Sequence, residues 1–120
     1  MGVTALVYSV TACSAARRPS AEQEARIERA EMRDVDHELQ RDQRVGALVD
    51  RYHIEDEVLT VLVDAAAWKR LRASGQDAFK RTLWSPWHAS YVRHHPGTTE
   101  RVFLKVEDMV GNDLGSYFET

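Results

Sequence analysis

The chain has 120 residues, of which 43% are hydrophobic, and it carries a formal net charge of -3 with a pI near 5.9. This length indicates one domain with a small core, and the acidic balance argues against nucleic acid as the main partner, because phosphate binding usually needs a basic surplus. The single cysteine, Cys13, excludes an internal disulfide and a zinc site built from cysteines.

Residues 1–16 contain no charged side chain and are apolar or small throughout. The run is too short to span a bilayer as a helix and is typical of the apolar and cleavage regions of a secretory signal. Its segment Val10-Thr11-Ala12-Cys13 resembles the lipobox of bacterial lipoprotein precursors, in which small residues precede a cysteine that is lipidated on its thiol. The resemblance implies a signal peptide over residues 1–12 and a lipid anchor on Cys13.

The lipoprotein resemblance also implies a location. Residues 13–19 would be a tether that holds the rest of the chain at the membrane of the bacterial cell envelope, facing the periplasm or the exterior. The alternative is that residues 1–12 form a strand or a short helix and that Cys13 is an ordinary buried thiol, because no Lys or Arg precedes the apolar run. The protein would then be cytoplasmic.

A strongly charged helix is predicted over residues 20–49. Ser20 has the character of an N-cap, and Gln23 completes a capping box with it. Of the residues from 22 to 44, thirteen of twenty-three are charged, with Ile27, Val35 and Leu39 as the main apolar points. The pattern favours a solvated helix that rests on the domain by a thin apolar seam; the alternative is a helix that binds a partner or a second copy.

Residues 50–120 are predicted to form a small α+β domain. Arg51–Asp56 reads as a linker, and Val58–Val63 reads as a buried strand because five of its six residues are apolar. Asp64 is then the N-cap of a helix that begins at Ala65. Gly75 marks a close approach to the sheet or the junction of two shorter helices. The apolar stripe of this helix comprises Trp68, Leu71, Gly75, Phe79 and Leu83.

The segment after Leu83 is rich in aromatic residues and histidine. Pro86 predicts that the helix ends or kinks at Ser85 and that a second short helix begins there. The composition favours aromatic rings that close the end of a small core, because small domains often complete their cores with aromatic residues. The functional alternative is a partner-binding surface, because aromatic side chains dominate binding energy at interfaces. A metal site on His88, His94 and His95 is disfavoured because adjacent histidines rarely reach one ion. The predicted partner-binding residues are Trp84, Trp87, His88 and Tyr91.

The last twenty residues read as a hairpin. Arg101–Glu107 alternates core and mixed positions, Gly111 and Asn112 are turn formers, and Leu114–Phe118 is a short third strand. The predicted order is helix, strand, helix, strand, strand, which gives a small mixed three-stranded sheet with a polar N-terminal helix. The strand-helix-strand unit should be parallel with a right-handed crossover.

No phosphate loop, nucleophile elbow or zinc-protease motif occurs in the sequence, so we expect no enzyme and no cofactor. The leading hypothesis is a small non-enzymatic envelope lipoprotein whose α+β domain is a protein-interaction module. The alternative is a cytosolic accessory or regulatory protein that binds nucleic acid through a basic helix face. That face would comprise Lys69, Arg70, Arg72, Lys80 and Arg81.

Overall fold

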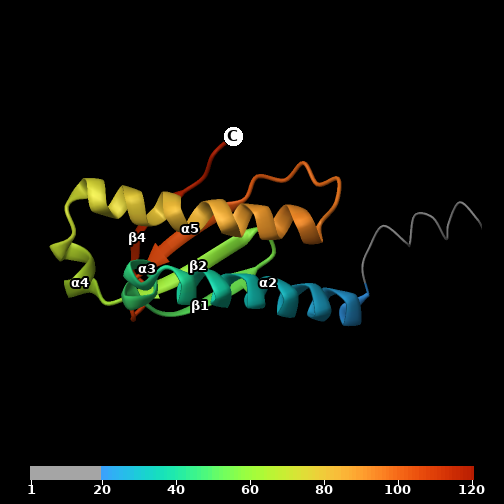
Figure 1. The fold of residues 1–120 in the computed structure, drawn as a ribbon, viewed down its shortest axis with the longest axis horizontal. Coiled ribbons are helices and arrows are strands. Elements are labelled where there is room, and N and C mark those ends of the chain that lie inside the picture. The colour runs from blue at the N-terminus through green and yellow to red at the C-terminus, as the bar shows by residue number, and fades with distance from the viewer. Residues whose placement is uncertain (1–19) are drawn as a thin grey trace, which may run out of the picture.

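The computed structural model describes residues 20–120, which form a four-stranded sheet with helices on one of its faces (Figure 1). The predicted α+β class is confirmed. In chain order the elements are α2 (Ala21–Arg41), α3 (Gln43–Leu48), β1 (Val49–Glu55), β2 (Val58–Val63), α4 (Ala65–Arg70), α5 (Ala73–His94), β3 (Phe103–Glu107) and β4 (Asp113–Tyr117).

The strands lie in the order β1-β2-β3-β4, with β2 and β3 parallel at the centre and an antiparallel strand at each edge. The crossover through α4 and α5 joins the parallel pair, and β3 and β4 form the predicted hairpin. The strand predicted at 58–63 is confirmed with the same bounds. Its apolar, β-branched residues suit a central strand, which is covered on both sides by neighbouring strands.

The prediction of three strands is wrong by one, because the segment expected to be a linker is part of strand β1. Tyr52 and Ile54 pair with Val61 and Leu59 of β2 and pack against the core, while His53 between them is exposed. A two-residue turn, in which Asp56 has a left-handed φ of 51°, joins β1 to β2. The sequence did not predict this turn because it lacks an Asn-Gly or Asp-Gly pair, which is the usual sequence signal of a two-residue hairpin turn.

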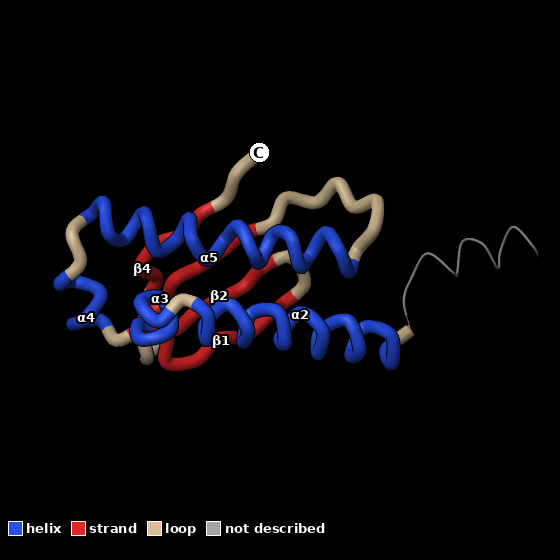
Figure 2. Tube along the Cα trace, in the orientation of Figure 1, coloured by secondary structure: helices blue, strands red, loops and turns tan. Residues whose placement is uncertain are grey.

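Helices α2 and α5 lie side by side over the sheet (Figure 2). The capping box at the start of α2 is confirmed: the Ser20 hydroxyl accepts from the Gln23 N–H at 3.1 Å, and the Gln23 side chain accepts from the Ser20 N–H at 2.9 Å. The helix predicted over 20–49 is interrupted, because α2 ends at Arg41 and Asp42 caps the separate helix α3. The end of the predicted helix, Val49, is the first residue of β1.

The helix expected after β2 is also divided. Asp64 caps α4 as predicted, since its carboxylate accepts from the Ala67 N–H at 2.9 Å. The chain then breaks at Leu71 and Arg72, whose backbones are extended, and not at Gly75. The break lets the Trp68 ring meet the Phe79 ring edge to face, with 5.3 Å between centroids.

The predicted helix end at Ser85 is wrong, because α5 continues through Pro86 to His94. A proline inside a helix removes one N–H, and the group that loses its partner is the carbonyl four residues earlier. That carbonyl belongs to Thr82, which is exposed, so water can replace the lost hydrogen bond. The exposed position of this turn explains why the proline is tolerated.

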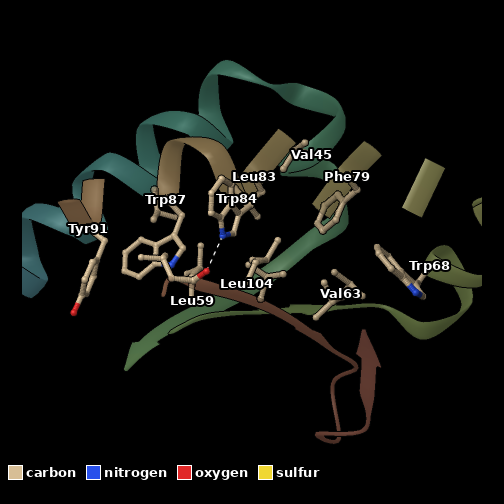
Figure 3. Packing of buried hydrophobic residues seen from close by; sticks show 14 residues of the cluster. Val45, Leu59, Val63, Trp68, Phe79, Leu83, Trp84, Trp87, Tyr91 and Leu104 are labelled. Carbon is tan, nitrogen blue, oxygen red and sulfur yellow. Dashed lines mark hydrogen bonds between the residues drawn. The ribbon is translucent and has the colours of Figure 1, made fainter. Parts of the chain in front are cut away.

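The core lies between the helices and the sheet (Figure 3). Leu59, Val61 and Val63 of β2 and Leu104 and Val106 of β3 are completely buried. Aromatic side chains of α4 and α5 cover them, namely Trp68, Phe79, Trp84, Trp87 and Tyr91. Within residues 20–120, no helix combines the length and the apolar character that a membrane crossing requires.

Candidate functional site

A cleft of about 390 Å³ lies where the N-terminal half of α2 meets the end of α5, the β1–β2 turn and the loop before β3. Carboxylates dominate its walls, and none of the residues that the structure places around it is Lys or Arg. We call it the acidic cleft. Its carboxylates are Glu24, Glu28, Glu31, Asp56, Glu57 and Glu100.

Glu31 is the unusual member of the acidic cleft. Its residue surface is only 3% exposed, and its Oε2 atom is buried without a hydrogen-bond partner among the described residues. Burial raises the pKa of Glu31 from its usual 4.5 to about 7, and the negative charges of Glu28, Asp34 and Asp56 add to the rise. A buried oxygen of this kind is costly unless something pairs with it.

The position of Glu31 on α2 explains its burial. Glu31 lies four residues after Ile27 and four before Val35, so the three side chains share one face of the helix. That face packs toward α5 and the sheet, where Val35 is 3% exposed. The packing of the apolar seam therefore carries the Glu31 carboxylate inward.

Two aromatic rings form another wall of the acidic cleft. The His95 ring stacks on the Tyr91 ring, with 3.9 Å between centroids and 15° between planes. The Nδ1 atom of His95 lies 2.9 Å from the Tyr91 carbonyl and 3.7 Å from Oε2 of Glu31. Because a carbonyl only accepts, Nδ1 carries a proton and donates it to Tyr91, so Oε2 of Glu31 receives no hydrogen bond from His95 and forms an ion pair with it only when the ring is protonated. The Tyr91 hydroxyl donates to Glu100 at 3.1 Å.

A second cluster, on the same side of the molecule, ties α2 to α5. One oxygen of Asp34 accepts from the Ser90 hydroxyl at 2.6 Å and from Arg93 at 2.9 Å, and it lies 3.2 Å from Nε2 of His94. Burial alone would raise the pKa of Asp34, but these three partners outweigh burial and lower it. The cluster fixes the position of α2 relative to α5, the two helices that contribute to the acidic cleft.

An adjoining hollow of about 550 Å³ shares Ile27, Tyr91, His95 and Glu100 with the acidic cleft. Gln23 and Arg26 of α2, His94 of α5 and the loop residues 96–98 complete its lining. The adjoining hollow gives the acidic cleft an approach from solvent between α2 and the loop.

Three of the four predicted partner-binding residues are in the core. Trp84, Trp87 and Tyr91 are 6%, 1% and 3% exposed. The Trp84 indole donates to the carbonyl of Val102 at 2.9 Å, and the Trp87 indole donates to the carbonyl of Phe103 at 3.1 Å. The aromatic rings therefore complete the core, which is the interpretation that the sequence favoured, and they do not form the alternative exposed surface. His88 stacks on Trp84 and is half-buried.

The three histidines considered as metal ligands point to different partners. His88 faces Trp84, His94 faces Asp34 and His95 faces Tyr91. Within the described part of the chain, no group of three or more His, Cys, Asp or Glu side chains is arranged to hold a metal ion.

The residues of the predicted basic face do not belong to one helix. The break after α4 separates Lys69 and Arg70 from the basic residues of α5. Lys80 is partly buried, pairs with Asp77 at 3.5 Å and lies against Gly115 of β4. The predicted lipidation site Cys13, the signal peptide and the tether lie outside the described residues.

Sequence analysis missed the acidic cleft as a site. Its carboxylates come from α2, the β1–β2 turn and the loop before β3, so no local motif joins them. One signal was present: Glu31 occupies an apolar-seam position, four residues from Ile27 and from Val35. A charged residue within a helix seam is a candidate for a functional group.

Comparison with known proteins adds no relative from which a role could be transferred. No protein-family model matches the chain, and no curated protein and no solved structure matches it either.

Proposed function

We propose that the chain is a small non-enzymatic lipoprotein of the bacterial cell envelope, anchored through Cys13, whose α+β domain is a protein-interaction module. Its acidic cleft receives a positively charged segment of the partner. The observation that carries the proposal is the Glu31 carboxylate, buried and without a hydrogen-bond partner in a cleft lined by five further carboxylates. A cation supplies the pairing that this group lacks.

The chemistry of the acidic cleft favours binding over catalysis. The nearby serine, Ser90, is fully buried, and its hydroxyl is engaged with Asp34. A nucleophile needs access to a substrate and a base that takes its proton. Grouped carboxylates with apolar neighbours such as Ile27 and Ile54 instead suit recognition of a basic side chain.

The anchor is tested by expressing the full-length protein and its Cys13→Ala variant in a bacterium and separating the membranes. We expect the native chain in the membrane fraction, shortened and labelled by a fatty-acid probe, and the variant unlabelled. If both chains remain full-length, unlabelled and outside the membrane fraction, the lipoprotein assignment is wrong and the cytosolic alternative replaces it.

The interaction surface is tested by photocrosslinking in cells. A photoreactive amino acid at Gln23, beside the acidic cleft, is compared with one at Asp77, near the other end of α5. We expect an adduct from position 23 alone, joined to a basic segment of the partner, and its loss when Glu28→Lys is added. Equal adducts from both positions, or an adduct unaffected by Glu28→Lys, would show that the partner binds elsewhere.

A further inference from the structure

We propose that the acidic cleft binds one guanidinium group, that of an arginine side chain, with the Glu31 carboxylate as its anchor and the stacked Tyr91 and His95 rings as one wall. The inference deepens the proposed function by naming the chemical group that the partner presents. It rests on the proposed function only in assigning that group to a partner protein. The binding of a guanidinium to this cleft is a property of the folded chain and is tested on the chain itself.

The first argument is charge. Six carboxylates line one cavity, and none of the residues that line it is Lys or Arg; Arg26 lines the adjoining hollow but not this cavity. The other carboxylates contact water at the rim, but Glu31 is 3% exposed and its Oε2 atom has no partner among the described residues. A ligand cation that reaches Glu31 makes a charge-assisted hydrogen bond in a poorly solvated place, where such bonds are strong.

The second argument separates an organic cation from a metal ion. Calcium needs six to eight oxygen ligands at about 2.3–2.6 Å, and no group of side chains in residues 20–120 is arranged to hold a metal. The cleft also presents apolar surface, from Ile27 of α2 and Ile54 of β1. A charged group at the end of a hydrocarbon stem fits carboxylates interleaved with isoleucines.

The third argument favours guanidinium over ammonium. A guanidinium is planar, is more weakly hydrated than an ammonium and stacks on aromatic rings. Moving a guanidinium from water to the neighbourhood of Glu31 therefore costs less hydration free energy than moving an ammonium. Its N–H donors lie in one plane and point in several directions, so one group can donate to Glu31 and to a second carboxylate at the same time. The His95 ring, stacked on Tyr91, supplies a flat neighbour.

Binding should depend on pH, because only the ionised form of Glu31 attracts the cation. The buried position raises the pKa of Glu31 to about 7 in the free protein, so arginine binding releases a proton at lower pH. Affinity should rise by about 30-fold between pH 5.5 and pH 8.5, since each pH unit below the pKa is a factor of ten. The groups that face Glu31 are Glu28 and Asp34 of α2, Asp56 and Glu57 of the turn, Tyr91 of α5, His95 directly after α5, and Glu100.

The test is a calorimetric titration of the full chain with N-acetyl-arginine amide at pH 8 and low salt. The citrulline analogue has the same shape without the charge, the lysine analogue carries an ammonium, and calcium chloride supplies a divalent cation. We expect saturable binding of one arginine probe per chain, weaker binding of the lysine probe and no heat from the other two. Equal binding of arginine and citrulline, or binding of calcium without arginine, overturns the proposal.

Two variants locate the binding. Glu31→Gln should weaken the arginine probe at least tenfold and abolish the dependence on pH, whereas Glu22→Gln, an exposed α2 residue outside the cleft, should change neither. Glu28→Gln alters the exposed rim, preserves the buried core and should give a smaller loss. Unchanged arginine affinity in Glu31→Gln contradicts the proposal. If the probe binds as expected but the cells yield no cleft-dependent adduct, the guanidinium site stands and the proposed partner function fails.

Discussion

At the scale of single residues, the Glu31 carboxylate lowers the stability of the folded chain. Glu31 holds its proton more tightly in the folded chain than in the unfolded one, because burial disfavours its charge. Stability from this residue is therefore fully present below pH 4.5 and is lost as the pH rises from there to about 7. By linkage, the loss amounts to up to about 3 kcal/mol at pH 8.

Replacing Glu31 with glutamine should remove that loss. We expect Glu31→Gln to match the native protein in free energy of unfolding near pH 4 and to exceed it by about 1–3 kcal/mol at pH 8. Urea unfolding at the two pH values measures the difference, with Glu22→Gln as the exposed control. A variant that is less stable than the native chain at pH 8 would mean that the carboxylate is paired in the folded protein.

Trp84 provides a second prediction at this scale, because it separates a core role from a binding role. Trp84→Phe leaves the buried Val102 carbonyl without its donor and removes part of a buried ring. We expect a loss of about 1–3 kcal/mol in the free energy of unfolding. Affinity for the arginine probe should be unchanged in a folded sample. A loss of binding without a loss of stability would show that Trp84 belongs to the binding surface.

At the scale of elements, the contact between α2 and α3 requires a glycine. A Cβ atom on Gly46 would clash with the carbonyl oxygen of Leu39, which is backbone and cannot rotate away. We expect Gly46→Ala to cost about 2 kcal/mol or more in unfolding free energy. Gly75→Ala is the matched control: its Cβ would meet only the Leu71 side chain at 3.7 Å, and alanine should stabilise α5 by up to about 1 kcal/mol. Equal effects at the two positions would show that the close approach does not exist in solution.

The elements were predictable where the cue was local. The Asp64 cap, the strand at 58–63 and the Ser20 capping box each depend on residues within a few positions, and all three are confirmed. Strand β1 was missed because it is an edge strand in which charged residues flank the short run from Tyr52 to Ile54. The helix end predicted from Pro86 was wrong because a helix tolerates a proline where the preceding turn faces water. The hydrophobic periodicity of the sequence does not show whether that turn faces water.

At the scale of the whole molecule, the parallel pair β2 and β3 is the most protected part of the fold. Three apolar residues of β2 and two of β3 are completely buried, and each strand has a neighbour on both sides. We expect their amide hydrogens to exchange only through global unfolding and those of the first turn of α2 to exchange much faster. Hydrogen exchange followed by mass spectrometry measures this, and slower exchange in α2 than in β2 would contradict the layered core described above.

By itself, the sequence determined the class of fold, the central strand, the helix caps and the C-terminal hairpin, because hydrophobic periodicity and capping are short-range properties. It also supplied the lipobox-like segment at Cys13, on which the proposed location rests. Only the tertiary structure decided that the aromatic segment belongs to the core and that four distant parts of the chain surround one buried glutamate. The reason is physical: burial and the electrostatic environment of Glu31 depend on which elements pack together, and no local pattern carries that information.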